Sequence, residues 1–195
     1  MVDIALGHQM DCLMHLLGPF VSVTATAHTY YNVATIVDND NKPTGKTLEN
    51  EAPDHVTFTG LLKSGAIANV IMRAGHPSTP GRRQLLWEID GELGTIRMEG
   101  DARRFHSSTE PELIVIHVFN IAGSAFTNIR NPKLYLNGEL VDVQPGGMMH
   151  NLTSAWAEFA KGKDGNYATL EDAVRVRTLL EGVLRSAREK CMIEL

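Results

Sequence analysis

FVSVTATAHTYY, residues 20–31, is a run of β-branched and aromatic residues with period-2 alternation. This pattern predicts a strand that turns one face to a core and the other to solvent. The expected core face carries Val21, Val23, Ala25 and Ala27. The expected outer face is polar and carries Ser22, Thr24, Thr26 and His28. We therefore expect a sheet that is packed on one side only, with an open face that binds a ligand or a second subunit.

Pairs of strand-like runs follow downstream, each pair joined by a short turn. They are residues 55–62 and 66–73, 84–90 and 93–98, and 134–136 and 140–143. Asn137-Gly138 between the last two is a strong hairpin signal, and residues 113–119 form one more strand-like run. Residues 38–53 combine Asp, Asn, Lys, Pro and Gly without periodicity, which predicts a long exposed loop. About seven or eight strands are expected in all.

Helical periodicity marks both ends of the chain. Apolar residues recur at three- and four-residue steps over residues 4–17, and Gly18-Pro19 ends this pattern. Helices are also predicted over residues 149–161 and 170–190, the second with Thr169 as its N-cap. Hairpin strands bracketed by helices predict an α+β fold: an open, largely antiparallel mixed β-sheet with helices packed on one face. The core is expected to include Cys12, Trp87 and Trp156.

Length and composition limit the classes of function. A chain of 195 residues with 43% hydrophobic and 21% charged residues is expected to form a single domain, residues 1–195. The net charge of -5 argues against binding to nucleic acid or to an anionic membrane, since phosphate contacts need clustered Lys and Arg. Cys12 and Cys191 imply neither a disulfide framework nor a zinc site. Without a membrane span or a signal-peptide pattern, a cytoplasmic, reducing compartment is expected.

Four segments carry a family resemblance. They read VDIALGHQMDCLMHLLGPFVSVTATA (2–27), APDHVTFTGLLKSGAIANVIMRAG (52–75), WEIDGELGTIRMEG (87–100) and YATLEDAVRVRTLLEGVLRSAREK (167–190). In this order they resemble the C-terminal domain of the Gfo/Idh/MocA family, which includes glucose-fructose oxidoreductase and inositol dehydrogenase. The sequences of these segments most resemble the fungal Gal80-like branch of that family. The fold that the resemblance implies is an open mixed sheet with helices on one face, in agreement with the periodicity.

The resemblance also implies a chemistry. Family enzymes move a hydride between a sugar or polyol carbon and NAD(P), using a lysine on a nucleotide-binding half together with an Asp and a His that open the C-terminal half. His8 matches that histidine, but the position four residues before it is Ile4, and Asp3 is one place off. No Gly-x-Gly-x-x-Gly opening a βαβ unit occurs in these 195 residues. We therefore expect no nucleotide-binding domain and no cofactor here.

The candidate catalytic residues are His8, Asp11 and His28. His8, Asp11 and His15 recur at helical spacing near one face, where they could form an acid-base pair or a weak metal site. The alternative is that they cap or hydrogen-bond neighbouring segments. We expect no metal site, because the histidines are scattered and metal sites need convergent ligands. His28 is expected on the open face of its strand.

The candidate substrate-binding residues are Tyr30, Arg73, His76 and His150. Arg73 ends a predicted strand and His76 lies in the Pro-rich loop after it, so a pocket formed with His8, His28 and Tyr30 is expected. A surface ion pair is the alternative for Arg73. His150 begins a helix after Pro145-Gly146-Gly147, where it contacts a ligand or caps the helix.

Three functions remain open at this point. The first is a cofactor-independent enzyme of the isomerase, cyclase or lyase type that acts on an organic small molecule, with fungal small-molecule biosynthesis as its setting by resemblance. The second is the substrate and oligomerisation half of an NAD(P)-dependent oxidoreductase. The third is a Gal80-like regulator that binds a protein. A homodimer formed through the open sheet face is expected, with a small-molecule substrate and no nucleic-acid or membrane partner.

Overall fold

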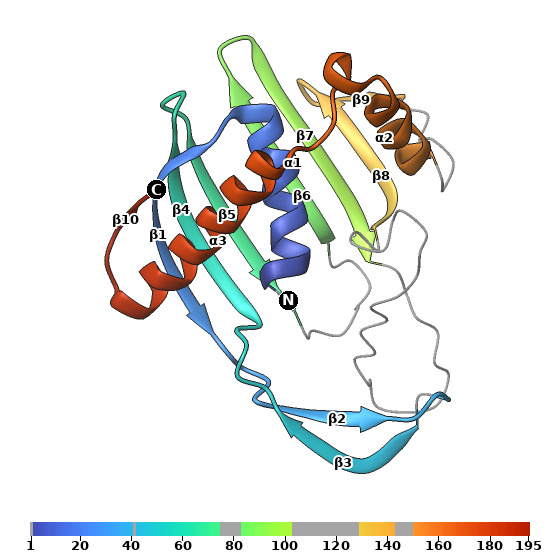
Figure 1. Ribbon diagram of the computed structural model, residues 1–195, viewed down its shortest axis with the longest axis vertical. Coiled ribbons are helices and arrows are strands. Elements are labelled where there is room, and N and C mark those ends of the chain that lie inside the picture. The colour runs from blue at the N-terminus through green and yellow to red at the C-terminus, as the bar shows by residue number, and fades with distance from the viewer. Residues whose placement is uncertain (1, 41, 75–82, 103–128, 143–149) are drawn as a thin grey trace. The chain divides into compact units, whose positions relative to one another are not determined.

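The fold is that of a computed structural model, which describes residues 2–40, 42–74, 83–102, 129–142 and 150–195 (Figure 1). Contacts divide the chain into two compact units, Met1–His76 with Ala168–Leu195, and Pro77–Tyr167. The predicted strand at residues 113–119 lies outside the described residues.

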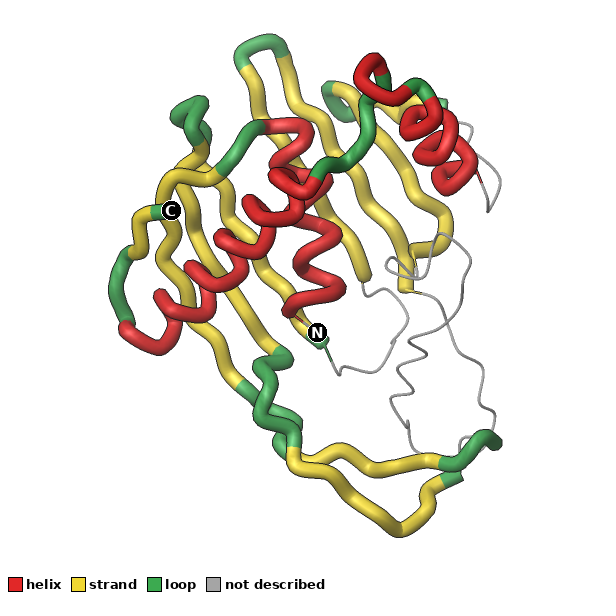
Figure 2. Tube along the Cα trace, in the orientation of Figure 1, coloured by secondary structure: helices red, strands yellow, loops and turns green. Residues whose placement is uncertain are grey.

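The first unit contains a sheet, sheet A, with strand order β10-β1-β4-β5. Its strands are β1 (Phe20–His28), β4 (His55–Leu62), β5 (Ile67–Arg73) and β10 (Ile193–Glu194), and every pair is antiparallel. Helices α1 (Gly7–Leu17) and α3 (Leu170–Glu189) cover one face of this sheet (Figure 2). The predicted α+β fold with an open antiparallel sheet is therefore confirmed.

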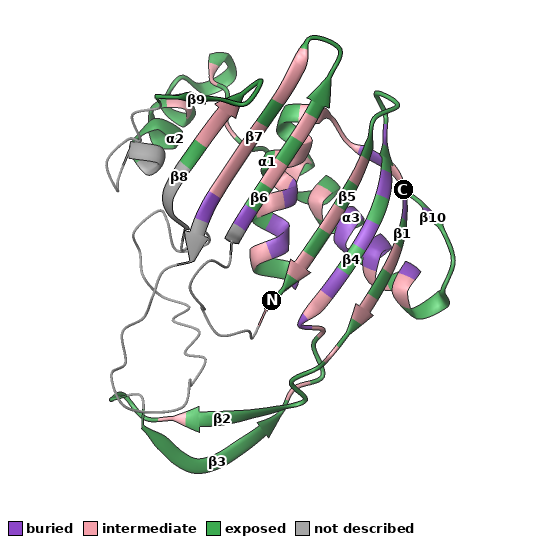
Figure 3. Cartoon of the chain, turned by 180° about the vertical axis from the view of Figure 1, so that it is seen from behind, coloured by how far each residue is buried: buried purple, intermediate pink, exposed green. Residues whose placement is uncertain are grey.

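The core of the first unit lies between sheet A and the two helices. The buried apolar side chains include Leu6, Met10, Val23, Val56, Phe58, Leu62, Leu179 and Val183. Each fully buried side chain of this kind contributes about 1.5–3 kcal/mol to folding. Gly60 on β4 is part of this fit, because a Cβ there would overlap the Phe20 ring. The alternation in β1 and β4 leaves the opposite face of sheet A exposed (Figure 3).

Helix α3 begins with the predicted cap. Thr169 Oγ1 accepts a hydrogen bond from Asp172 N at 3.2 Å, and Asp172 Oδ2 accepts one from Thr169 N at 2.8 Å, which completes a capping box. Near its C-terminal end, the buried Ser186 hydroxyl donates to Cys191 O at 2.6 Å and accepts from Ala25 N at 2.9 Å. This one side chain therefore joins the helix, the chain end and β1.

A two-stranded hairpin of β2 (Val33–Val37) and β3 (Pro43–Glu49) follows β1. The prediction of a long loop over residues 38–53 is therefore wrong. The sequence lacks alternation because nearly every residue of both strands is exposed, so no core face exists to impose one. Asp38 shapes the turn, since its Oδ1 accepts hydrogen bonds from Asp40 N and Lys42 N, each at 2.9 Å.

The second unit contains a sheet of β6 (Arg83–Gly91), β7 (Gly94–Ala102), β8 (Ile129–Leu136) and β9 (Glu139–Val141), in that order. Both predicted hairpins are confirmed. Asn137 and Gly138 have positive φ angles of 52° and 86°, as a primed two-residue turn requires. Helix α2 (His150–Ala160) lies in the same unit.

Two residues expected in the core are exposed. Cys12 lies on α1 two positions after the buried Met10, which turns it about 200° away around the helix. Trp156 on α2 is 63% exposed, and its ring packs edge-on against Phe159 at 5.8 Å between centroids. Trp87 is partly buried. Cys12 and Cys191 are both free thiols, and burial of part of its surface raises the pKa of Cys12.

Candidate functional site

A groove between α1 and α3 contains two of the predicted catalytic residues, His8 and Asp11. Its cavity measures about 300 Å³. The polar side chains that line it are Asp3, His8, Asp11, Thr169, Asp172 and Arg177. All of them belong to the first unit, so this site is formed within one compact body. The volume suits a small metabolite at the lower end of ordinary ligand pockets.

A π-helical turn, η1 (Val2–Leu6), determines which acid reaches this groove. A π-helix bonds residue i to i+5, so it absorbs one more residue per turn than an α-helix. Asp3 and His8, five residues apart, therefore lie on the same side, and both line the groove. Ile4, four residues before His8, is not among the lining residues. The one-residue offset seen in the sequence thus does not separate the acid from the histidine.

The groove is acidic. Three carboxylates, of Asp3, Asp11 and Asp172, line it against one guanidinium, of Arg177. Arg177 Nη1 lies 2.8 Å from Asp3 Oδ1. Hydrogen bonds from the Thr169 backbone and hydroxyl lower the pKa of Asp172 below its ordinary value. Ionised acceptors in this number favour a ligand that donates hydrogen bonds over one that is an anion.

A second set of candidate residues lies at the rim of sheet A, where β1 and β5 end and β4 begins. His28 pairs with His55, and His55 pairs with Arg73, so the three stand in one row across the strands. Tyr30 follows β1, and its ring lies edge-on to both imidazoles, with 4.5 Å between centroids in each case. Among the described residues Arg73 has no ion pair. We call His28, His55 and Arg73 the rim row.

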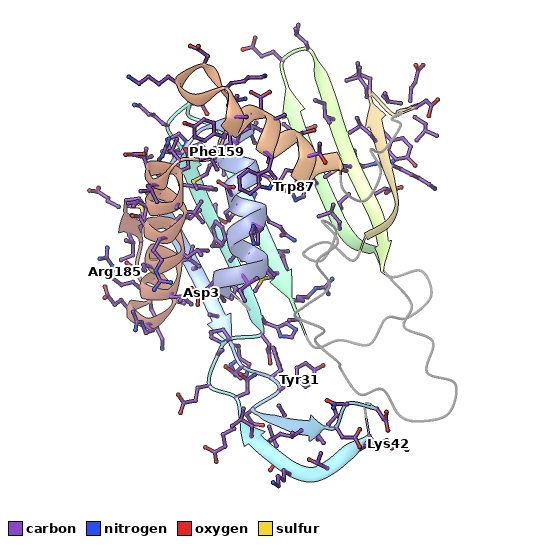
Figure 4. The ribbon with its side chains drawn as sticks, turned by 45° about the vertical axis from the view of Figure 1, so that its right-hand side comes forward. Asp3, Tyr31, Lys42, Trp87, Phe159 and Arg185 are labelled. Carbon is purple, nitrogen blue, oxygen red and sulfur yellow. The ribbon has the colours of Figure 1, made fainter. Side chains whose placement is uncertain are left out.

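The Asp54 carboxylate positions the central histidine of the rim row, His55. The Asp54 side chain is buried and accepts hydrogen bonds from Tyr30 N at 3.0 Å, Tyr31 N at 2.7 Å and His55 Nδ1 at 2.6 Å. Burial by itself would raise the pKa of Asp54, but the hydrogen bonds from His55 and from the two amides outweigh it, and the pKa lies below its ordinary value. Figure 4 shows Tyr31 at the junction between β1 and the β2–β3 hairpin, which this carboxylate holds in place.

The structure groups the predicted residues into two places. His8 and Asp11 line the groove on the helix side of sheet A together with Asp3, which Figure 4 labels, while His28, Tyr30 and Arg73 lie at the rim on its open side. His76 lies outside the described residues. His150 is the first residue of α2 in the other unit, and its side chain is not described.

Sequence reasoning missed Asp54, His55 and the role of Asp3. The signal for the first two was local: an acid directly before the first residue of a predicted strand, followed by a histidine on its open face. Asp3 could have been found only by allowing one inserted residue in the helix, which sequence spacing does not indicate.

Metal and dinucleotide chemistry find no support in the part of the chain that the structure describes. There, no group of three or more His, Cys, Asp or Glu side chains could hold a metal ion. All the strand pairs described there are antiparallel, whereas a dinucleotide-binding βαβ unit needs parallel strands. No helix within the described ranges has the length and apolar character needed to cross a membrane.

An open antiparallel sheet covered on one face by two helices is the fold that this chain shares with solved oxidoreductase structures. The chain belongs to the family of the Gal80p C-terminal domain, whose sequence profile matches residues 1–100. The resemblance to the Gfo/Idh/MocA family and its Gal80-like branch is thereby confirmed, and solved oxidoreductases share the fold as well.

Similar proteins fall into two classes. The chain is 33% identical over 108 residues to dehydrogenase aclE of Aspergillus oryzae, covering 54% of this chain and 28% of that protein. It is 27% identical over 104 residues to the galactose/lactose metabolism regulatory protein GAL80 of Kluyveromyces lactis, covering 52% and 23%. The solved structure of the Kluyveromyces lactis transcriptional regulator Gal80p has a TM-score of 0.71 at 20% identity, over 97% of this chain and 46% of that one. The chain thus spans less than half of each of these proteins.

Proposed function

We propose that this chain forms the substrate-side half of an oxidoreductase-type protein and that its α1–α3 groove binds a small, neutral, polyhydroxylated molecule. The observation that carries the proposal is the convergence of Asp3 and His8 on the groove across the π-helical turn. The relatives are a dehydrogenase and a regulatory protein of galactose/lactose metabolism, and the second of these supports a setting in sugar metabolism. The relatives give no support to the cofactor-independent isomerase, cyclase or lyase expected from the sequence. They favour the two alternatives, the substrate half of an NAD(P)-dependent oxidoreductase and a Gal80-like regulator.

The groove can hold a hydroxyl group and move its proton. An imidazole such as that of His8 accepts a proton from a bound hydroxyl, and a neighbouring carboxylate stabilises the imidazolium that forms. Asp3 lines the same groove as His8, and its carboxylate forms an exposed ion pair with Arg177 on α3. Asp11 accepts a hydrogen bond from a further hydroxyl of the ligand, whereas both carboxylate oxygens of Asp172 are already engaged by Thr169 and Arg175. A hydride carrier would have to be held by residues outside those described, so we derive no redox step.

The proposal predicts weak, specific binding of neutral polyols to the purified chain. Saturation-transfer NMR with glycerol, myo-inositol and glucose should detect binding of at least one of them, with a Kd in the millimolar range, which corresponds to about 4 kcal/mol. His8→Ala should weaken this binding by about tenfold, because a hydrogen bond to the ligand is lost.

His28→Ala is the matched control, since His28 lies on β1 at the open side of sheet A and does not line the groove. It should leave polyol binding unchanged. Equal loss in both variants, or no binding by the wild-type chain, would refute a polyol site in the groove.

We further propose that the open face of sheet A forms a homodimer, as a second property of the same half. Apolar side chains stand on this face among threonines. Ile67 and Ile71 of β5 are 70% and 72% exposed, and Leu61 of β4 is 41% exposed. Exposed apolar side chains gathered on one sheet face favour association with another protein surface. A Gal80-like regulator would use the same face for a different protein.

Light scattering after size exclusion should show a dimer of the wild-type chain, and Ile71→Lys should convert it to a monomer, because burying the ammonium is costly. Leu93→Lys is the control, since Leu93 is 98% exposed in the turn between β6 and β7. A monomeric wild type, or a dimer unaffected by Ile71→Lys, would exclude this interface.

A further inference from the structure

We propose that the rim row of His28, His55 and Arg73 binds an oxyanion, a carboxylate or a phosphate group. This site is separate from the groove and does not depend on the function proposed for it. The groove lies on the helix side of sheet A and is acidic, whereas the rim row lies at the edge of the open face and carries one guanidinium and two imidazoles.

The register of three strands brings these side chains together. His28 on β1 is the cross-strand partner of His55 on β4, and His55 is the partner of Arg73 on β5. Directly paired residues place their Cβ atoms about 4.5–5.5 Å apart on the same face. His28 and Arg73 therefore flank His55 at about 10 Å from each other, a span that the long guanidinium side chain can cross.

Asp54 and Tyr30 hold the side chains of the rim row in place. Asp54 is 6% exposed and holds His55 through Nδ1 at 2.6 Å. The Tyr30 ring contacts both imidazoles at 4.5 Å between centroids and restricts how they turn. The same carboxylate accepts from Tyr30 N at 3.0 Å, so one buried group positions the ring and the central imidazole together.

The charges at the rim favour an anion. The Asp54 carboxylate already accepts three hydrogen bonds, from Tyr30 N, Tyr31 N and His55 Nδ1. Arg73 and His28 are exposed, and neither has an ion pair within the described ranges. A guanidinium matches the two oxygens of a carboxylate or phosphate, and imidazolium groups add charge-assisted hydrogen bonds.

The groups that face His55 are Asp54 beside it, His28 on β1, Arg73 on β5, and Tyr30 and Tyr31 in the turn. A protonated imidazole donates from both of its nitrogens, so anion binding is measured at both pH 6 and pH 8.

The test is a titration of the histidine side-chain NMR signals with sodium phosphate, sodium acetate and glycerol, at constant ionic strength and at pH 6 and pH 8. We expect the signals of His28 and His55 to shift with at least one anion and not with glycerol. Arg73→Ala and His28→Ala should each weaken binding by about tenfold, and Arg73→Lys should retain part of it. A response to phosphate alone identifies a phosphoryl ligand, and a response to acetate a carboxylate.

Lys46→Ala is the control variant, because Lys46 is an exposed cation on β3 away from the row. It should bind as the wild type does, and so should His8→Ala in the groove. The proposal is overturned if neither anion shifts His28 and His55, if glycerol shifts them equally, or if Lys46→Ala weakens binding as much as Arg73→Ala. Loss of polyol binding with intact anion binding would contradict only the groove.

Discussion

Asp54→Ala is expected to lower the free energy of unfolding by about 2–3 kcal/mol, because three hydrogen bonds to a buried carboxylate are lost at once. The amides of Tyr30 and Tyr31 lose their acceptor, and His55 loses the group that orients it. Asn50 also spans the junction between β1 and the β2–β3 hairpin, donating from Nδ2 to Tyr31 O at 3.1 Å and from its backbone N to Asn32 O at 2.8 Å, but it carries no buried charge. Urea unfolding followed by circular dichroism measures the change.

The effect of Asp54 depends on pH in a defined direction. Its pKa in the folded chain lies below the ordinary value. Its contribution to stability is therefore complete above the pKa of an unfolded aspartate, about 4, and is lost as pH falls from there through the lower folded pKa. The difference in stability between the wild type and Asp54→Ala should be constant from pH 6 to pH 5 and should shrink below pH 4.

Asp38→Ala is the matched control, since Asp38 also accepts two backbone hydrogen bonds but is exposed. Water replaces the carboxylate there, so the loss should stay below about 1 kcal/mol. Equal losses in the two variants, or a difference that does not change with pH, would show that burial of Asp54 does not matter.

Ser186→Ala is expected to cost about 1–3 kcal/mol, because both backbone groups that its hydroxyl serves are left without a partner. β10 pairs with β1 only at Ser22 and Val23, so Ala25 N lies beyond its reach and bonds to Ser186 Oγ instead. The hydroxyl also donates to Cys191 O in the turn before β10. Thermal unfolding should show a lower Tm for Ser186→Ala and a Tm near the wild type for Ser64→Ala.

Ser64 suits this comparison because its hydroxyl accepts a long, exposed bond of 3.5 Å from Ala66 N. If Ser186→Ala matched Ser64→Ala in stability, the link between α3, β1 and the chain end would carry no free energy.

Elements with a one-sided core were predictable from the sequence. The alternation at residues 23–28 is the alternation of burial in β1, and the periodicity of residues 170–189 is the face of α3 that packs on sheet A. At the start of β1 the register shifts between Phe20 and Ser22, so that Phe20 and not Val21 is buried. Turn chemistry located the hairpin at Asn137-Gly138, because its positive φ angles need such residues. Each of these signals is local and physical.

The features that escaped prediction lack a local signal. The β2–β3 hairpin has no buried face to impose alternation, and it is held by backbone pairing and by Asp38. The π-helical turn changes which residues share a side by one position, which no spacing rule for α-helices anticipates. The rim row depends on register across three strands, so His55 joined His28 and Arg73 only in the structure.

The two sites suit different ligand groups. The groove presents carboxylates to hydroxyl donors, and the rim row presents cations to an oxyanion, on opposite sides of sheet A. Such a division would suit a half-protein that recognises a neutral molecule at one place and an acidic group at another.

A residue-resolved titration tests most directly whether the α1–α3 groove binds a polyol. Backbone amide spectra of the isotopically labelled chain should be recorded with increasing myo-inositol, glycerol or glucose. We predict saturable shifts, for at least one of these polyols, that centre on residues 3–11 and 168–177, the segments that line the groove. Shifts confined to the rim row, or an absence of saturable shifts with all three, would contradict the account.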